Sequence, residues 1–220
     1  MPSDLELLRT IERAPLRTMR YSDMAERGTN VWRQLDRLVE AGAITRLAKG
    51  VYTAPPEGAD GRQWKPTLEI AGLAVATARV GNRNAVLMGL GAARFYAAIP
   101  RAIGVTTVAI PADAPTRPPV ELEHGGKLMM IPRDLNKLDA MLVGTELGEG
   151  LVATPAQTLY DMLMRPKQGG MPDEAAAAAQ NLRGQASASE LGSVVREHMR
   201  SNDAVRQVVI ELQESARRRG

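Results

Sequence analysis

The segment from residue 21 to residue 53, YSDMAERGTNVWRQLDRLVEAGAITRLAKGVYT, constrains the fold more than any other part of the chain. Its pattern predicts a short helix, a turn, a longer helix from about Asn30 and a two-stranded hairpin. This is the order of elements in a winged helix-turn-helix DNA-binding unit. Gly42 is expected to end the longer helix, and Gly50 to allow the reversal between the strands. Four apolar residues recur at helical spacing and predict one buried stripe: Val31, Leu35, Leu38 and Val39.

The face opposite this stripe carries arginine and amide side chains, which pair bidentately with guanine and adenine edges in the major groove. The predicted base-reading residues are Asn30, Arg33, Gln34 and Arg37. On the hairpin, Arg46 and Lys49 fall where a phosphate or the minor groove would pass. Most exposed arginines on helices only face solvent. The DNA-binding prediction therefore depends on the hairpin that comes after the helix.

Three regions divide the chain. Residues 1–54 are the expected winged helix-turn-helix domain, which opens with a helix capped by Ser3 and Glu6 and broken by Pro15. Residues 55–66 are rich in Pro and Gly and are interpreted as a linker, with Trp64 docking on the second domain. Residues 67–220 form this second domain, which is expected to be a mixed α/β domain with a helical C-terminal region. The predicted fold class is therefore α+β.

The second domain alternates helical and strand patterns before it becomes helical to its end. Helices are expected over residues 67–79, 89–98, 154–165 and 173–182, and again after Ser187 and Asn202. Strands are expected over 105–110, 120–123, 128–131, 141–147 and 151–153, and residues 85–88 form a short apolar run that leads into the 89–98 helix. Thr154 with Gln157, and Ser187 with Glu190, have the spacing of capping boxes.

Composition excludes several classes of protein. The absence of cysteine excludes disulfides, thiol catalysis and Cys-type zinc sites. No run reaches the roughly 18 apolar residues of a membrane span, and the start of the chain is unlike a signal peptide, so a cytoplasmic protein is expected. The net charge of +3 is too small to identify a nucleic-acid-binding protein by itself.

Several runs carry a family resemblance. LDRLVEAGAITRLAKGVYT, GLGAARFYA, VTTVAIP and ATPAQTLYDML are similar to segments of the AbiEi-type antitoxins, transcriptional regulators of bacterial abortive-infection toxin–antitoxin pairs. The resemblance implies an antitoxin and autorepressor that binds double-stranded operator DNA. It also implies a cognate nucleotidyltransferase-like toxin as partner, with direct contact left open, and no cofactor. Gly89 and Gly91 stand where the family often has serine or histidine.

The residues argue against catalysis. The two histidines, His124 and His198, have neither metal-pair nor triad spacing, and His198 is interpreted as a surface residue. Gly89 and Gly91 lack the third glycine of a dinucleotide fingerprint, and small residues there are expected to allow close helix packing. Three alternatives stay open: a nuclease-like effector targeted by the winged unit, a stand-alone transcriptional regulator, and a winged unit that serves protein interaction alone.

Overall fold

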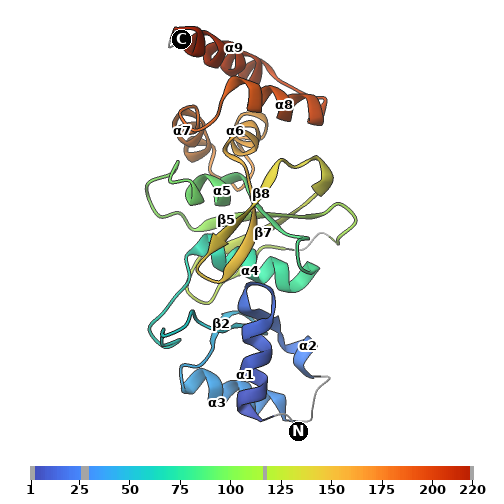
Figure 1. Ribbon diagram of the computed structural model, residues 1–220, viewed down its shortest axis with the longest axis vertical. Coiled ribbons are helices and arrows are strands. Elements are labelled where there is room, and N and C mark those ends of the chain that lie inside the picture. The colour runs from blue at the N-terminus through green and yellow to red at the C-terminus, as the bar shows by residue number, and fades with distance from the viewer. Residues whose placement is uncertain (1–2, 26–29, 116–117, 219–220) are drawn as a thin grey trace.

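The computed structural model describes residues 3–25, 30–115 and 118–218, and these form an α+β protein. Figure 1 shows an elongated molecule with the N-terminal helices at one end. The larger sheet lies in the middle, and the last helices stand at the other end. The parts of the chain therefore succeed one another along the long axis.

The N-terminal region begins as its sequence predicts and then adds an unexpected strand. Helix α1, Asp4–Arg13, starts at Ser3 with the predicted capping box to Glu6. After the single turn η1, Pro15–Arg17, strand β1 runs from Thr18 to Arg20. The sequence pattern does not predict this strand. It pairs antiparallel with β3, Val51–Thr53, and makes a three-stranded sheet in the order β1-β3-β2.

The middle of this region matches the predicted order of elements. Helix α2 spans Tyr21–Ala25, α3 spans Val31–Glu40, and strand β2 spans Thr45–Ala48. Gly42, at φ +73°, closes α3 as predicted. The amide of Ala43 donates to the Leu38 carbonyl at 2.9 Å, and the amide of Gly42 to the Val39 carbonyl at 3.0 Å.

The predicted stripe of α3 forms the core of the N-terminal region. Val31, Leu35 and Leu38 are buried, and Val39 is partly buried. They pack against buried residues from the other N-terminal elements: Leu7, Ile11, Met24, Ile44, Tyr52 and Ala54. Because this stripe is buried in the core, the opposite face of α3 is turned to solvent.

A six-stranded mixed sheet forms the middle of the molecule, in the order β6-β7-β5-β4-β9-β8. Its strands are β4 Val86–Met88, β5 Val105–Pro111, β6 Val120–Glu121, β7 Lys127–Arg133, β8 Ala140–Thr145 and β9 Gly148–Ala153. The turn η2, Leu135–Lys137, joins β7 to β8. Strands β5 and β7, and β4 and β9, pair parallel, whereas the other neighbours pair antiparallel. The predicted hairpin of β6 and β7 is confirmed.

Helix α4, Leu68–Val80, lies between this sheet and the N-terminal region (Figure 1). The sequence predicts one buried face carrying Leu68, Leu73 and Val80. In the structure every residue from Glu69 to Thr77 is buried, while Leu68 and Val80 are only partly buried. A helix covered on both sides needs small and apolar residues all round, which explains its alanines.

Small residues also bring α5, Gly89–Phe95, onto the sheet. A Cβ atom at Gly91 would lie 2.6 Å from Thr106 Oγ1 and 2.9 Å from the Thr107 carbonyl oxygen. The expectation that these glycines permit close helix packing is confirmed.

Four helices complete the chain: α6 Pro155–Met164, α7 Pro172–Leu182, α8 Ala188–His198 and α9 Asp203–Arg217. The capping box of Ser187 and Glu190 is confirmed. At α6, Thr154 accepts the Gln157 amide as predicted. The Gln157 side chain does not return to Thr154, however, because its oxygen accepts the amide of Asp139 instead.

The central core joins the N-terminal region to the sheet. Leu16, Leu47, Ala48 and Val51 belong to the same buried cluster as α4 and the central strands, with Trp64 packed against it. Residues of the predicted linker are also held in place, since the Gly61 amide donates to the Gly42 carbonyl at 2.8 Å. The boundaries at 54 and 66 stay a prediction, but the regions on either side share a core.

Candidate nucleic-acid interface

Two of the predicted base-reading residues stand at the start of α3 with exposed side chains. Asn30 precedes the helix and makes no capping bond through its side chain, and Arg33 lies one turn later. Both are available to a ligand because the buried stripe holds α3 against α1 and the small sheet. Polar side chains at a helix start are suited to reading base edges.

The other two predicted base-reading residues are held by Asp4 of α1. Arg37 Nε and Nη2 donate to the two Asp4 oxygens at 3.0 and 2.8 Å, and Gln34 Nε2 donates at 3.2 Å. The hydrogen bond from Arg37 lowers the pKa of Asp4, which therefore stays ionised near neutral pH. The pair remains exposed to solvent.

An aromatic pair next to these residues was missed from the sequence. Trp32 of α3 is 49% exposed, and its ring meets that of Tyr21 edge to face, 5.5 Å between centroids. The Tyr21 amide donates to the Gly50 carbonyl at 2.7 Å, so α2 is tied to the hairpin turn. The signal in the sequence was a large apolar residue one position after Val31, outside the buried stripe.

The turn between β2 and β3 presents Lys49 to solvent. Gly50 takes the left-handed conformation there, at φ +70°, and Lys49 is exposed. The strands shift register between Arg46 and Ala48. The intervening Leu47 carbonyl accepts the amide of Glu123 at 2.9 Å, so the outer edge of β2 is covered by the segment before β7.

Arg46 lies at this same junction rather than pointing freely outward. Its Nη1 is 3.7 Å from Glu123 Oε1, and its guanidinium lies over the Tyr52 ring at 5.6 Å. Its Nε is buried and has no hydrogen-bond partner in the described chain. The six predicted residues therefore divide into three groups. Asn30, Arg33 and Lys49 are exposed, Gln34 and Arg37 bind Asp4, and Arg46 contacts Glu123.

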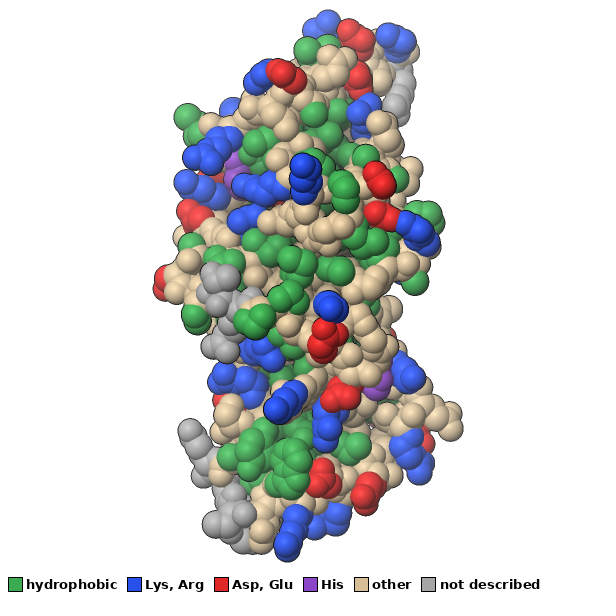
Figure 2. Space-filling model, turned by 180° about the vertical axis from the view of Figure 1, so that it is seen from behind, with side chains coloured by type: hydrophobic (Ala, Val, Ile, Leu, Met, Phe, Trp, Pro, Cys, Tyr) green, Lys and Arg blue, Asp and Glu red, His purple; other side chains and the backbone are tan. Residues whose placement is uncertain are grey.

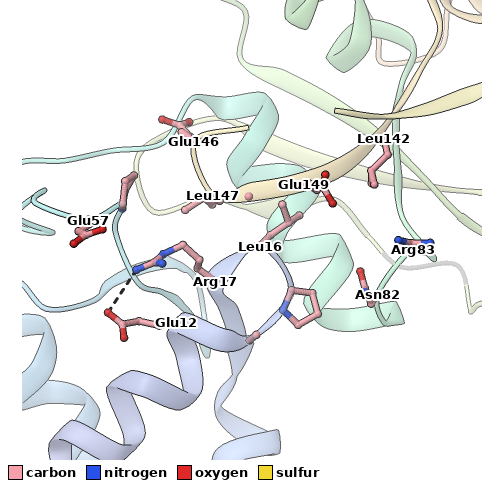
Figure 3. A pocket seen from close by; sticks show the side chains of 14 residues that line it. Glu12, Leu16, Arg17, Glu57, Asn82, Arg83, Leu142, Glu146, Leu147 and Glu149 are labelled. Atoms are coloured by element: carbon pink, nitrogen blue, oxygen red, sulfur yellow. Dashed lines mark ion pairs between the residues drawn. The ribbon is translucent and has the colours of Figure 1, made fainter. Parts of the chain in front are cut away.

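A hollow of about 540 Å³ lies between the N-terminal region and the large sheet (Figure 3). Among its lining residues are four glutamates and two arginines: Glu12, Glu57, Glu146, Glu149, Arg17 and Arg83. Arg17 is already engaged, because it donates to the Ala54 and Pro55 carbonyls at 3.0 and 2.8 Å and lies 3.5 Å from Glu12. The excess of carboxylates makes this hollow unsuited to phosphate.

Metal-binding clusters and membrane-spanning helices are also absent from the described residues. Within residues 3–25, 30–115 and 118–218, no group of three or more His, Asp and Glu side chains could hold a metal ion. In the same ranges, no helix combines the length and apolar character needed to cross a bilayer.

Comparison with known proteins supports the fold alone. Models of known families gave no match, and neither did the curated proteins. The chain resembles the RV2827C protein from Mycobacterium tuberculosis with a TM-score of 0.58 and 18% identity, over 98% of this chain and 78% of that one. An antigenic nucleotidyltransferase-like protein from Paracoccidioides brasiliensis matches at a TM-score of 0.36 and 12% identity, over 57% of this chain and 83% of that one. The first similarity identifies a shared fold, and the second is too low to carry an argument.

Proposed function

We propose that the N-terminal region is a winged helix-turn-helix that places α3 in the major groove of operator DNA. The protein would act as a cytoplasmic transcriptional autorepressor and as the antitoxin of a toxin–antitoxin pair. One observation carries the DNA-binding part. A helix fixed by its buried stripe exposes Asn30 and Arg33, and the hairpin after it exposes Lys49 at its turn.

The exposed residues have separate roles in this proposal. Asn30 and Arg33 read base edges, since an amide pairs with adenine and a guanidinium with guanine. Lys49 contacts a phosphate and therefore contributes to affinity without base preference. Trp32, exposed beside Arg33, packs against the sugar-phosphate wall of the groove.

Gln34 and Arg37 join the interface by exchanging partners. Both side chains bind Asp4 in the free protein, and the ion pair is exposed. Exposed ion pairs contribute little to stability, so a guanine edge or a phosphate can replace the carboxylate. Arg46 would have to leave Glu123 and the Tyr52 ring to reach DNA, and so its contribution should be the smallest.

The antitoxin part rests on the resemblance to AbiEi-type proteins. In this proposal the toxin is nucleotidyltransferase-like and is encoded next to this gene. The alternatives are a nuclease-like effector, a stand-alone regulator and a protein-interaction module. A nuclease would need a divalent metal, and an interaction module would show no salt-dependent DNA binding.

The test is a mobility shift with the DNA immediately upstream of this protein's gene, across a series of salt concentrations. Arg33→Ala should weaken binding by about 1–3 kcal/mol and relax base preference at one position. Lys49→Ala should weaken binding to all sequences and reduce the salt slope by about 1. Arg206→Ala is the matched control, because that arginine lies on α9 and pairs with Asp203.

Each result has a defined meaning. Specific binding that Arg33→Ala retains in full would refute the docking of α3, and absence of specific binding would leave the interaction module. Co-expression with the neighbouring gene tests the antitoxin role separately, since a regulator alone would not relieve that gene's toxicity. DNA cleavage that depends on added Mg²⁺ would favour the nuclease-like effector.

A further inference from the structure

A second polar cluster lies far from α3, where α6, α8 and the end of β7 meet. Its centre is His198, the last residue of α8, whose ring stacks on Tyr160 of α6 with centroids 4.7 Å apart. His198 is partly buried, so the expectation of a surface residue is wrong. Figure 2 shows Lys and Arg side chains gathered around a histidine in this half of the molecule.

Gln157 fixes which ring nitrogen of His198 carries hydrogen. Its Oε1 accepts the Asp139 amide at 3.3 Å, and its Nε2 donates to the Asp161 carboxylate at 3.2 Å. The amide orientation is thereby determined, because a backbone amide can only donate and an ionised carboxylate can only accept. His198 Nε2, 3.0 Å from Gln157 Oε1, must therefore be the donor. Nδ1 of the neutral ring keeps its lone pair and makes no hydrogen bond within the described chain.

Two of the four cations near His198 lie in no ion pair of the described residues. The positive side chains near His198 are Arg133, Lys137, Arg165 and Arg200, and the negative ones are Asp134, Asp139, Asp161 and Glu197. Arg165 lies 3.5 Å from Asp161, and Lys137 lies 3.9 Å from Asp134. Arg133 and Arg200 have no carboxylate partner in the described chain.

Arg133 also leaves a donor unused. Its Nη1 binds the neighbouring Pro132 carbonyl, but its Nε is buried without a hydrogen-bond partner in the described ranges. An unpaired buried donor on a charged group is costly, and such groups often mark the position of a water or an ion.

The electrostatic environment of His198 is consistent with an anion site. Burial lowers the pKa of His198, and the charges of Arg165, Lys137 and Arg133 lower it further, while Glu197 acts in the opposite direction. The ring is therefore neutral near pH 7 in the free protein. An anion bound among these cations would reverse their effect and favour protonation of Nδ1.

We propose that His198, Arg133 and Arg165, with Arg200 beside them, bind a phosphate monoester such as the terminal phosphate of a mononucleotide. Arginines bind phosphate through charge-assisted hydrogen bonds. A monoester can also share its proton with His198 Nδ1, since its second pKa is near 6. A phosphodiester in a nucleic-acid backbone has no such proton and carries one charge fewer.

Two histidines make the test direct, because His124 serves as an internal control. His124 contacts Thr45 at the junction with the N-terminal hairpin, far from α8. NMR titration of the imidazole signals would report on both residues at constant ionic strength. The probes are inorganic phosphate, adenosine 5′-monophosphate, and a short DNA duplex without terminal phosphates.

We expect inorganic phosphate and the mononucleotide to raise the apparent pKa of His198 saturably and to leave that of His124 unchanged. Arg133→Met and Arg200→Ala should each weaken phosphate binding about ten-fold, the effect of losing one charge-assisted hydrogen bond. Arg200 is exposed, so its variant keeps the test valid if Arg133→Met does not fold. Arg206→Ala is the control for loss of a positive charge.

Three results would overturn the proposal. If phosphate leaves the pKa of His198 unchanged, the unpaired nitrogen of Arg133 has a structural role filled by water. If both histidines respond equally, the effect is non-specific screening. If only the duplex shifts His198, the cluster reads nucleic-acid backbone rather than a monoester.

Discussion

The amide of Glu123 donates to the carbonyl of Leu47 at 2.9 Å, and this bond joins the edge of the small N-terminal sheet to the segment before β7. Two further contacts lie beside it. Arg46 is 3.7 Å from the Glu123 carboxylate, and Thr45 Oγ1 is 3.4 Å from His124 Nε2. With Leu47 in the central core, the hairpin and the large sheet form one packed unit.

Removing the Leu47 side chain should therefore destabilise the whole protein. Leu47 is 1% exposed, and Leu47→Ala should lower the free energy of unfolding by about 2–5 kcal/mol. Calorimetry should show one transition that moves to lower temperature. Leu5→Ala, at a position 55% exposed, is the control and should change stability by less than about 0.5 kcal/mol. Two separate transitions would contradict a shared core.

Asp4→Asn should strengthen operator binding. The change removes a negative charge beside α3 and releases Arg37 and Gln34 for DNA. Affinity and its salt slope should both increase, and mobility shifts across salt concentrations would measure them. Asp203→Asn removes the same charge from the start of α9 and should have no effect. Equal binding by the two variants would show that Arg37 and Gln34 take no part.

Gly91→Ala should destabilise the protein although alanine favours helices. The new Cβ would lie 2.6 Å from Thr106 Oγ1 and 2.9 Å from a backbone oxygen, so about 1–3 kcal/mol of overpacking is expected. Gly192→Ala in α8 is the matched comparison, because its nearest neighbour would be Arg196 Nη1 at 3.5 Å. That variant should gain up to about 1 kcal/mol from helix propensity. Urea unfolding of both variants would test the contrast.

Asp161 should make stability depend on pH. Burial raises its pKa from 3.8 to about 6, against the opposing charges of Arg165 and Arg133. Because the native pKa is the higher one, protonated Asp161 favours the native state. This stabilisation, about 3 kcal/mol, is full below about pH 4 and is lost as pH rises through about 6.

The Asp161→Asn variant should not lose stability in this way as pH rises, because its amide is neutral at every pH. The lowered pKa of His198 acts in the opposite direction, because its stabilisation is lost as pH falls. The measurement is therefore the difference between the wild type and the variant, from chemical unfolding at several pH values. A difference that stays constant between pH 4 and pH 7 would contradict the raised pKa of Asp161.

The features that the sequence predicts well depend on residues that are close to one another in the sequence. The α3 stripe, the Gly42 cap, the Gly50 turn and the capping boxes at Ser3 and Ser187 each involve residues within two turns of one another. Strand β1 was missed because its pattern is only three residues long. Its partner β3 lies on the far side of α2 and α3 in the sequence, so no local signal marks the pairing.

Local spacing indicated the position of single side chains but not their partners. Helical periodicity placed Arg37 on the outer face of α3, but the carboxylate that binds it comes from α1. The Thr154 spacing predicted a capping role for Gln157, whose side chain instead contacts Asp161 and His198. Long-range side-chain pairing of this kind leaves no periodic signal in the sequence.

The scarcity of aromatic residues gives this protein two well-separated optical reporters. The two tryptophans are Trp32, half exposed on α3, and Trp64, packed against the central core. Contact between α3 and a ligand should alter the emission of the first and leave the second unchanged. Loosening of the central core should instead shift the emission of the second to longer wavelength. Single-tryptophan variants would thus report separately on α3 and on the central core without any attached dye.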